Sequence, residues 1–203
     1  MSRPARGKAP VDWFGKPIPP SELQAFMKDK PSVRAYQVAG KERKGLGLAA
    51  SFEDYLKAEL GVPVGKWEEI REFLRGCVYA RDREVHGRDE LWLHPEDFER
   101  LRVGDCEDHA LWAWVRFVRL KWDARFTAGR RAGGGHAWVT IYQGRQVSVC
   151  ETTAKRSASF LMESADESAA AYIPIWTVDR DLSFHWHDPG GLGSSGIRFN
   201  SRP

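Results

Sequence analysis

The spacing of apolar residues changes once along this chain, near residue 122, from a helical period to a strand-like one. Before that point, two segments, 66–80 and about 106–121, carry apolar residues at i, i+3, i+4 and i+7, typical of helices with one buried face. After it, apolar and polar residues alternate in 136–142 and 146–151, typical of strands. Helices followed by strands predict an α+β fold with an antiparallel sheet.

Shorter elements complete this outline. Ser21 and Ser51 are suited to cap helices over 22–29 and 52–60, and Pro95 is suited to the first turn of a helix over 95–101. The segments 124–128, 172–178 and 182–187 are predicted strands, the last two forming a hairpin. Residues 129–135, with three consecutive glycines, are predicted to form a loop, and Gln143-Gly144 a two-residue turn.

A chain of 203 residues is long enough for one domain with a sizeable core. We expect an extended basic segment over 1–20 and a flexible tail over 188–203. Between them lies a single domain over 21–187, with a helical N-terminal part (21–101) and a catalytic core (102–187).

Composition argues against several classes of protein. The net charge of +3 comes from 31 basic and 28 acidic residues mixed along the chain, which does not predict a nucleic-acid partner. No stretch has the length of a membrane span, and no signal peptide is seen, so we expect a cytoplasmic protein without a membrane partner. Three cysteines without paired spacing do not predict a disulfide scaffold. The sequence does not indicate an oligomeric state.

The chemistry is expected around Cys106, in the run Gly-Asp-Cys-Glu-Asp at 104–108. A helix beginning here places the sulfur at its positive end, which favours the nucleophilic thiolate. Glu107 and Asp108 partly oppose that charge, so a cationic partner is needed. His136, which follows the glycine-rich segment, can accept the thiol proton and return it to a leaving amine. Cys77 is instead expected to be a buried core residue.

The third member follows from strand register. With a turn at Gln143-Gly144, Glu151 lies directly opposite His136 and can orient the imidazole through its second ring nitrogen. A longer loop would move the pairing by two and oppose His136 to Thr153. Glu151 would then be diagonal but on the same face, because side chains alternate with a period of two.

Three runs resemble the motif blocks of the transglutaminase-like superfamily: 104–108, Gly-His-Ala-Trp-Val at 135–139 and Glu-Thr-Thr at 151–153. Trp92-Leu-His-Pro-Glu is similar to the bacterial transglutaminase-like cysteine proteinases in particular. The resemblance covers about residues 90–155.

This resemblance implies a papain-like fold, with a Cys-bearing helix packed on an antiparallel sheet, and acyl transfer through a thioester. It also implies that Cys106 is the nucleophile, His136 the general base and acid, and Glu151 the orienting acid. The third position is usually Asp in these families, so Glu151 is a departure. No cofactor is required, although some of the bacterial proteinases bind calcium through acids flanking the Cys, where Asp105 and Glu107 stand here.

Several roles have alternatives. The oxyanion hole should include the Cys106 backbone N–H, with the Trp92 indole as a second donor or, equally, as a core residue. Trp138 is expected on the face opposite His136, as packing. Asp108 and His109 are expected on the helix surface, although Asp108 could instead brace the site. A zinc site combining Cys106 and His109 with His185 and His187 is disfavoured by arbitrary spacing, and the last two are expected on a strand surface.

The sequence therefore predicts a cysteine peptidase or amidase that hydrolyses amide bonds of proteins or peptides. Two alternatives stay open. One is a transamidase, with an amine in place of water as acyl acceptor. The other is a catalytically inactive transglutaminase-like module that binds proteins.

Overall fold

A computed structural model describes residues 35–36, 52–87, 91–154, 160–163 and 169–187. Its helices include α3 (Trp67–Arg75), α4 (Asp82–Val85), α5 (Pro95–Leu101), α6 (Cys106–Arg119) and the 3₁₀ turn η2 (Ala169–Ala171). The strands are β1 (Ala35–Tyr36), β2 (Val78–Tyr79), β3 (Trp92–Leu93), β4 (Val103–Gly104), β5 (Asp123–Arg131), β6 (Gly134–Gln143), β7 (Gln146–Cys150), β8 (Leu161–Glu163), β9 (Tyr172–Val178) and β10 (Phe184–Trp186). The predictions for 1–20, 22–29 and 188–203 fall outside the described residues.

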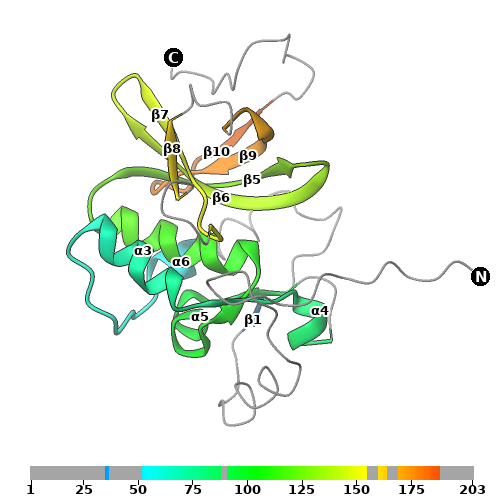
Figure 1. Cartoon of the computed structure of the whole chain (residues 1–203). Coiled ribbons are helices and arrows are strands. Elements are labelled where there is room, and N and C mark those ends of the chain that lie inside the picture. Colours follow the sequence, from blue (N-terminus) through cyan, green and yellow to red (C-terminus); the bar gives the residue numbers. More distant parts are fainter. Residues whose placement is uncertain (1–34, 37–51, 88–90, 155–159, 164–168, 188–203) are drawn as a thin grey trace, which may run out of the picture.

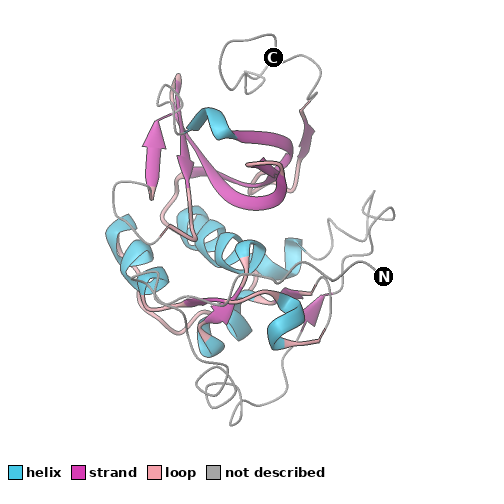
Figure 2. Cartoon of the chain, turned by 45° about the vertical axis from the view of Figure 1, so that its right-hand side comes forward, coloured by secondary structure: helices cyan, strands magenta, loops and turns pink. Residues whose placement is uncertain are grey.

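The α+β prediction is confirmed. Six strands form one antiparallel sheet in the order β10-β9-β5-β6-β7-β8, and the helices lie in a second layer (Figures 1 and 2). Helix α6 packs against β5 and β6 on one side and against α5 and α3 on the other. Within the described residues, no helix is both long and apolar enough to cross a membrane.

Helix α6 is buried along most of its length because it lies between the sheet and the other helices, α3 and α5. Trp112 stacks on Phe73 of α3 with a centroid separation of 3.9 Å, and the Trp114 indole donates to the carbonyl of Ala124 in β5 (3.1 Å). Burying a large apolar side chain stabilises a fold by about 1.5–3 kcal/mol. The two tryptophans therefore fix the helix, and with it Cys106 at its start, against both layers.

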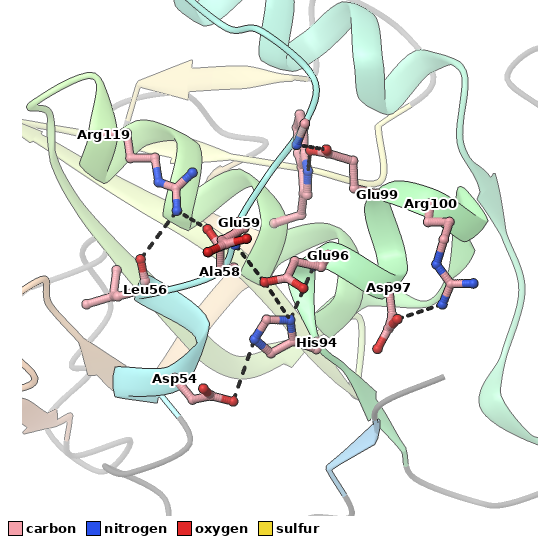
Figure 3. A network of polar contacts seen from close by, with 12 residues as sticks. Asp54, Leu56, Ala58, Glu59, His94, Glu96, Asp97, Glu99, Arg100 and Arg119 are labelled. Atoms are coloured by element: carbon pink, nitrogen blue, oxygen red, sulfur yellow. Dashed lines mark hydrogen bonds and ion pairs between the residues drawn. The ribbon is translucent and has the colours of Figure 1, made fainter. Parts of the chain in front are cut away.

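Polar contacts hold the segment after residue 52 onto this layer (Figure 3). Glu96 of α5 accepts from the backbone N–H of Glu59 (2.6 Å), and Glu99 accepts from the backbone N–H of Gly61 (2.6 Å). Arg119, at the end of α6, donates to the carbonyl of Ala58. The segment has few backbone partners of its own, so charged side chains from two helices satisfy it.

Two boundaries differ from the sequence prediction. The helix expected over 66–80 ends at Arg75, and Val78–Tyr79 instead pairs in parallel with β4. The loop expected over 129–135 is mostly strand. Strands β5 and β6 continue to a tight turn at Ala132 and Gly133, both with positive φ (49° and 82°). Positive φ at both central residues suits a hairpin turn. The chain therefore reverses over two residues, 132 and 133, and not over the seven residues of the predicted loop.

Candidate active site

A cleft of about 710 Å³ lies where the start of α6 meets the sheet. It is lined by Tyr79, Arg81, Asp82, Arg83, Trp92, Asp105, Cys106, Glu107, Ala128, Gly129, Arg130, Gly134, Gly135, His136, Ala137, Ile175 and Trp176. Cys106 and His136, far apart in sequence, thus open onto one space. Cys77 and Cys150 are buried elsewhere (1% and 0% exposed), as expected for Cys77.

His136 and Glu151 are in direct contact. Nε2 of His136 lies 2.7 Å from Oε2 of Glu151. The hairpin register pairs Gln143 with Gln146 and Val139 with Cys150, so the turn is at Gly144-Arg145, one residue later than predicted. Continued, this register opposes His136 to Thr153. Glu151 is therefore diagonal to His136, on the same face, and still reaches the ring.

The side chain of Glu151 is buried, and each of its carboxylate oxygens accepts hydrogen bonds. Oε1 accepts from the backbone N–H (3.0 Å) and hydroxyl (2.6 Å) of Thr153, and Oε2 also accepts from the Tyr172 hydroxyl (2.6 Å). The Arg131 guanidinium lies 3.7 Å from Oε2. Burial alone would raise the pKa of Glu151, but its bond to His136, that residue's charge and these hydroxyls lower the pKa to about 2. Glu151 is thus an ionised, fixed carboxylate.

Sequence reasoning missed Tyr172. Its ring lies 6.1 Å from the His136 ring and 5.3 Å from the Trp138 ring, centroid to centroid. The sequence showed only an aromatic residue at the start of a predicted strand. Tyr172 lies near Glu151 because β5 pairs with both β6 and β9, and this strand order is not apparent from the local sequence.

The surroundings of Cys106 oppose the predicted thiolate. The thiol donates to Oε2 of Glu107 (3.1 Å). Burial raises the pKa of Cys106 well above its ordinary value, and the charges of Glu107 and Asp105 raise it further, while the backbone of Ala137 lowers it only in part. A helix terminus contributes about 0.3–1 kcal/mol, which these opposing effects outweigh. These surroundings favour the thiol over the thiolate at Cys106.

Carboxylates gather behind the sulfur. One oxygen from each of Asp82, Asp105 and Asp108 lies within 4.8 Å of the others, and Asp105, Cys106 and Glu107 form an overlapping group. Asp108 is fully buried and accepts from the backbone N–H groups of Leu93 (2.8 Å) and Asp105 (3.2 Å), so its predicted surface position was wrong. Asp82, 24 residues before Cys106, carried no sequence signal for this site.

The clustered acids predict an unusual dependence of stability on pH. Burial raises the pKa of Glu107 to about 7 from an ordinary 4.5, with the charge of Asp108 adding to the effect. A carboxyl whose pKa is raised by folding contributes fully below pH 4.5, and this contribution is lost as the pH rises through about 7. We expect urea unfolding of the metal-free protein to show stability falling between pH 5 and about pH 8. Glu107→Gln should flatten that slope, whereas Glu72→Gln, on the exposed face of α3, should not; equal slopes in all three proteins would contradict the assignment.

Aromatic side chains wall the cleft. Trp92 is 3% exposed and stacks with Trp176 at a centroid distance of 6.5 Å. Trp92 thus has the position for either of its predicted roles, and its part in an oxyanion hole stays a prediction.

Trp138 was expected on the face opposite His136 and is instead stacked beside it (6.1 Å), because residues two apart in a strand share a face.

The disfavoured zinc site has no counterpart among the described residues, where the groups suited to a metal contain no histidine. His109 is buried, not on the surface, and its Nδ1 lies 2.7 Å from the carbonyl oxygen of Asp105. His185 contacts Asp179 (3.0 Å). His187 is 9% exposed and contacts Thr177 (3.3 Å), which corrects its predicted surface position.

Together the cysteine-bearing helix, the antiparallel sheet and the cleft between them have the transglutaminase-like, papain-like fold that the motif resemblance implied. The EGTA-treated structure of LapG from Legionella pneumophila is similar over 91% of this chain and 90% of its own, with a TM-score of 0.50 and 16% identity. Calcium-bound LapG aligns over 83% and 87% of the two chains (TM-score 0.49, 16% identity). A putative cysteine protease from Cytophaga hutchinsonii aligns over 77% and 53% (TM-score 0.37, 16% identity). No protein-family model and no curated protein matches the sequence.

Proposed function

We propose that this protein is a cysteine peptidase or amidase that cleaves amide bonds of proteins or peptides through Cys106, His136 and Glu151. One observation carries the proposal. His136, held at 2.7 Å by an ionised Glu151, opens onto the same cleft as Cys106 at the start of α6. A nucleophile, a base and a group that orients the base are the parts that acyl transfer requires.

In the proposed reaction Glu151 accepts from Nε2–H of His136, which leaves Nδ1 to take the thiol proton. Sulfur attacks the amide carbonyl, and the oxyanion is stabilised by donors that include the backbone N–H of Cys106. The C–N bond breaks as the imidazolium gives its proton to the amine, leaving a thioester. Water then loses a proton to His136, attacks the thioester and releases the acid and the thiol. A resting thiol favours proton transfer coupled to attack over a preformed ion pair.

Water is the favoured acceptor. The cleft is bordered by exposed residues, among them Arg81, Gly134 and Gly135, so bulk water can enter the cleft onto which the partly exposed Cys106 opens. A transamidase would need to exclude it. An amine acceptor is the second candidate.

The acids around Cys106 also fit calcium. Hard oxygen ligands from carboxylates are what Ca²⁺ prefers, and closely spaced carboxylates with raised pKa values need positive charge to ionise together. Asp105 and Glu107, with Asp82 and Asp108, would hold the ion, which would supply charge compensation beside the sulfur. One of the similar structures, LapG, is calcium-bound.

Calcium at this position should stabilise the fold. We expect about 1 mM CaCl₂ to raise the melting temperature by several degrees relative to EGTA, because a ligand that binds only the folded state stabilises it by mass action. Asp82→Asn should remove most of this shift, and Asp181→Asn, an exposed acid near β10, should keep it. An equal shift in both variants, or none in the parent protein, would place calcium elsewhere or nowhere.

Trapping the thioester tests the proposed function. The protein would be incubated with a library of peptides blocked at both ends, quenched in acid and analysed by mass spectrometry for an acyl adduct on Cys106. Iodoacetamide labelling supplies a control for a correctly folded site, in which Cys106 should react faster than the buried Cys77 and Cys150. A folded protein that forms no adduct and cleaves no peptide would support the binding-module alternative.

Tyr172→Phe tests whether the hydroxyl on Glu151 supports turnover. A hydrogen bond to a charged group is worth about 1.5–3 kcal/mol, so losing part of it should lower kcat roughly 3- to 10-fold. KM should change little, because the hydroxyl touches Glu151 and not the substrate. Tyr142→Phe, a phenol on the same sheet, is the control, and equal kcat for the two variants would remove Tyr172 from the site.

A further inference from the structure

Every exposed charged residue that lines the cleft is an arginine. These are Arg81 and Arg83 on the helical wall and Arg130 on the sheet wall. The acids that line it are more enclosed: Asp82 is 2% exposed, Glu107 is 6% exposed, and Asp105 is half-buried. A ligand entering from solvent therefore meets guanidinium groups before it meets carboxylates.

Two of these arginines are not used by the fold. Within the described part of the chain, neither Arg81 nor Arg130 forms an ion pair, whereas the neighbouring Arg131 lies 3.7 Å from Glu151. A guanidinium is always charged and presents a planar fork that matches a carboxylate. Unpaired guanidiniums on a cleft rim are suited to a ligand's carboxylates.

Their positions flank the proposed chemistry. Arg130 pairs across the β5–β6 ladder with Gly135, the residue before His136. Arg81 precedes Asp82 at the start of α4, on the opposite wall. A Cβ added to Gly135 would have no atom within 4 Å, so space is open beside His136 for a peptide backbone.

The acids of the cleft lie deeper than the arginines at its mouth. Asp82 is 2% exposed and Glu107 is 6% exposed, whereas Arg81 and Arg130 are exposed. The exposed rim therefore dominates what an approaching ligand experiences.

We propose that the cleft selects peptide segments with acidic side chains on both sides of the cleaved amide. One of these side chains would form an ion pair with Arg130 and the other with Arg81. This inference rests on the proposed peptidase function and adds the class of substrate. Exposed charge pairs of this kind are individually weak, and they raise association rates more than they slow dissociation.

The test begins with cleavage of the same blocked library, with products sequenced by mass spectrometry. Cleaved peptides should be enriched in Asp and Glu next to the scissile bond. Replacing those acids by Asn and Gln in the best peptide should lower kcat/KM roughly 3- to 10-fold at low salt, and less at high salt. Blocked ends exclude a terminal carboxylate as the recognised group, and the unblocked form of the best peptide tests that source directly.

Charge reversal assigns the effect to the rim. Arg130→Glu and Arg81→Glu should each invert the preference between acidic peptides and matched Lys peptides, whereas Arg145→Glu, at the exposed β6–β7 turn, should preserve it. Cleavage of acidic, neutral and basic peptides at equal rates would overturn this inference and leave the peptidase function standing. Absence of both cleavage and a Cys106 adduct would overturn the peptidase function itself.

Discussion

Cys106→Ala is expected to lower amide cleavage by at least about 10³-fold, because removal of the nucleophile leaves only substrate binding and the oxyanion donors. The melting temperature should change by no more than a few degrees. Cys106 is partly exposed, and its thiol donates to Glu107, which belongs to a cluster of acidic side chains. Turnover by peptide mass spectrometry and thermal unfolding by circular dichroism measure the two quantities.

Cys77→Ala is the matched control for Cys106→Ala. Cys77 is 1% exposed and packs in the main core, so its loss should lower stability yet leave kcat unchanged. The opposite outcome, in which Cys106→Ala unfolds the protein and Cys77→Ala abolishes turnover, would sink the assignment of the nucleophile. Retained activity in Cys106→Ala would sink the thioester mechanism outright.

The parts of the site that could be predicted from sequence depend on periodicity and on local order. The turn of the hairpin was placed one residue too early, which moved the pairing of β6 and β7 by two residues. An error of two keeps every side chain on its own face, so His136 and Glu151 still meet. The same periodicity puts Trp138, two residues after His136, on the face of His136, so the sequence prediction of the opposite face was wrong.

The charge state of Cys106 could not be predicted in the same way. The local sequence gives the helix start, but burial depends on the sheet that covers it, and Asp82 reaches the cluster from a separate helix. Tyr172 likewise reaches Glu151 by way of sheet order. The electrostatic potential at the sulfur depends on residues that the topology brings together, so a local motif can suggest candidate residues but not their protonation states.

Gly129→Ala should cause a larger loss of stability than the same substitution at any other described glycine of the six-stranded sheet. A Cβ there would lie 2.1 Å from the carbonyl oxygen of Ile173, 2.6 Å from the Trp138 ring and 2.9 Å from the Cα of Pro174. Overpacking a well-packed interior costs about 1–3 kcal/mol, and more where backbone must move, as here between β5 and β9. Because backbone must move here, we take a cost of about 3 kcal/mol, the upper end of that range, and expect the melting temperature to fall by about 6–12 °C, since 1 kcal/mol corresponds to about 2–4 °C at this chain length.

Gly135→Ala is the matched control, because it adds the same methyl six residues away on the adjoining strand with no atom within 4 Å. Its stability should stay within about 0.5 kcal/mol of the parent protein, the range usual for surface substitutions. The contact of Gly129 also explains why a glycine-rich run predicted as a loop is strand. The absence of a side chain at this position lets β9 approach β5, and that approach carries Tyr172 towards the carboxylate that orients His136. If Gly129→Ala were as stable as Gly135→Ala, β5 and β9 would not be packed as described, and the link from Tyr172 to Glu151 would lose its structural basis.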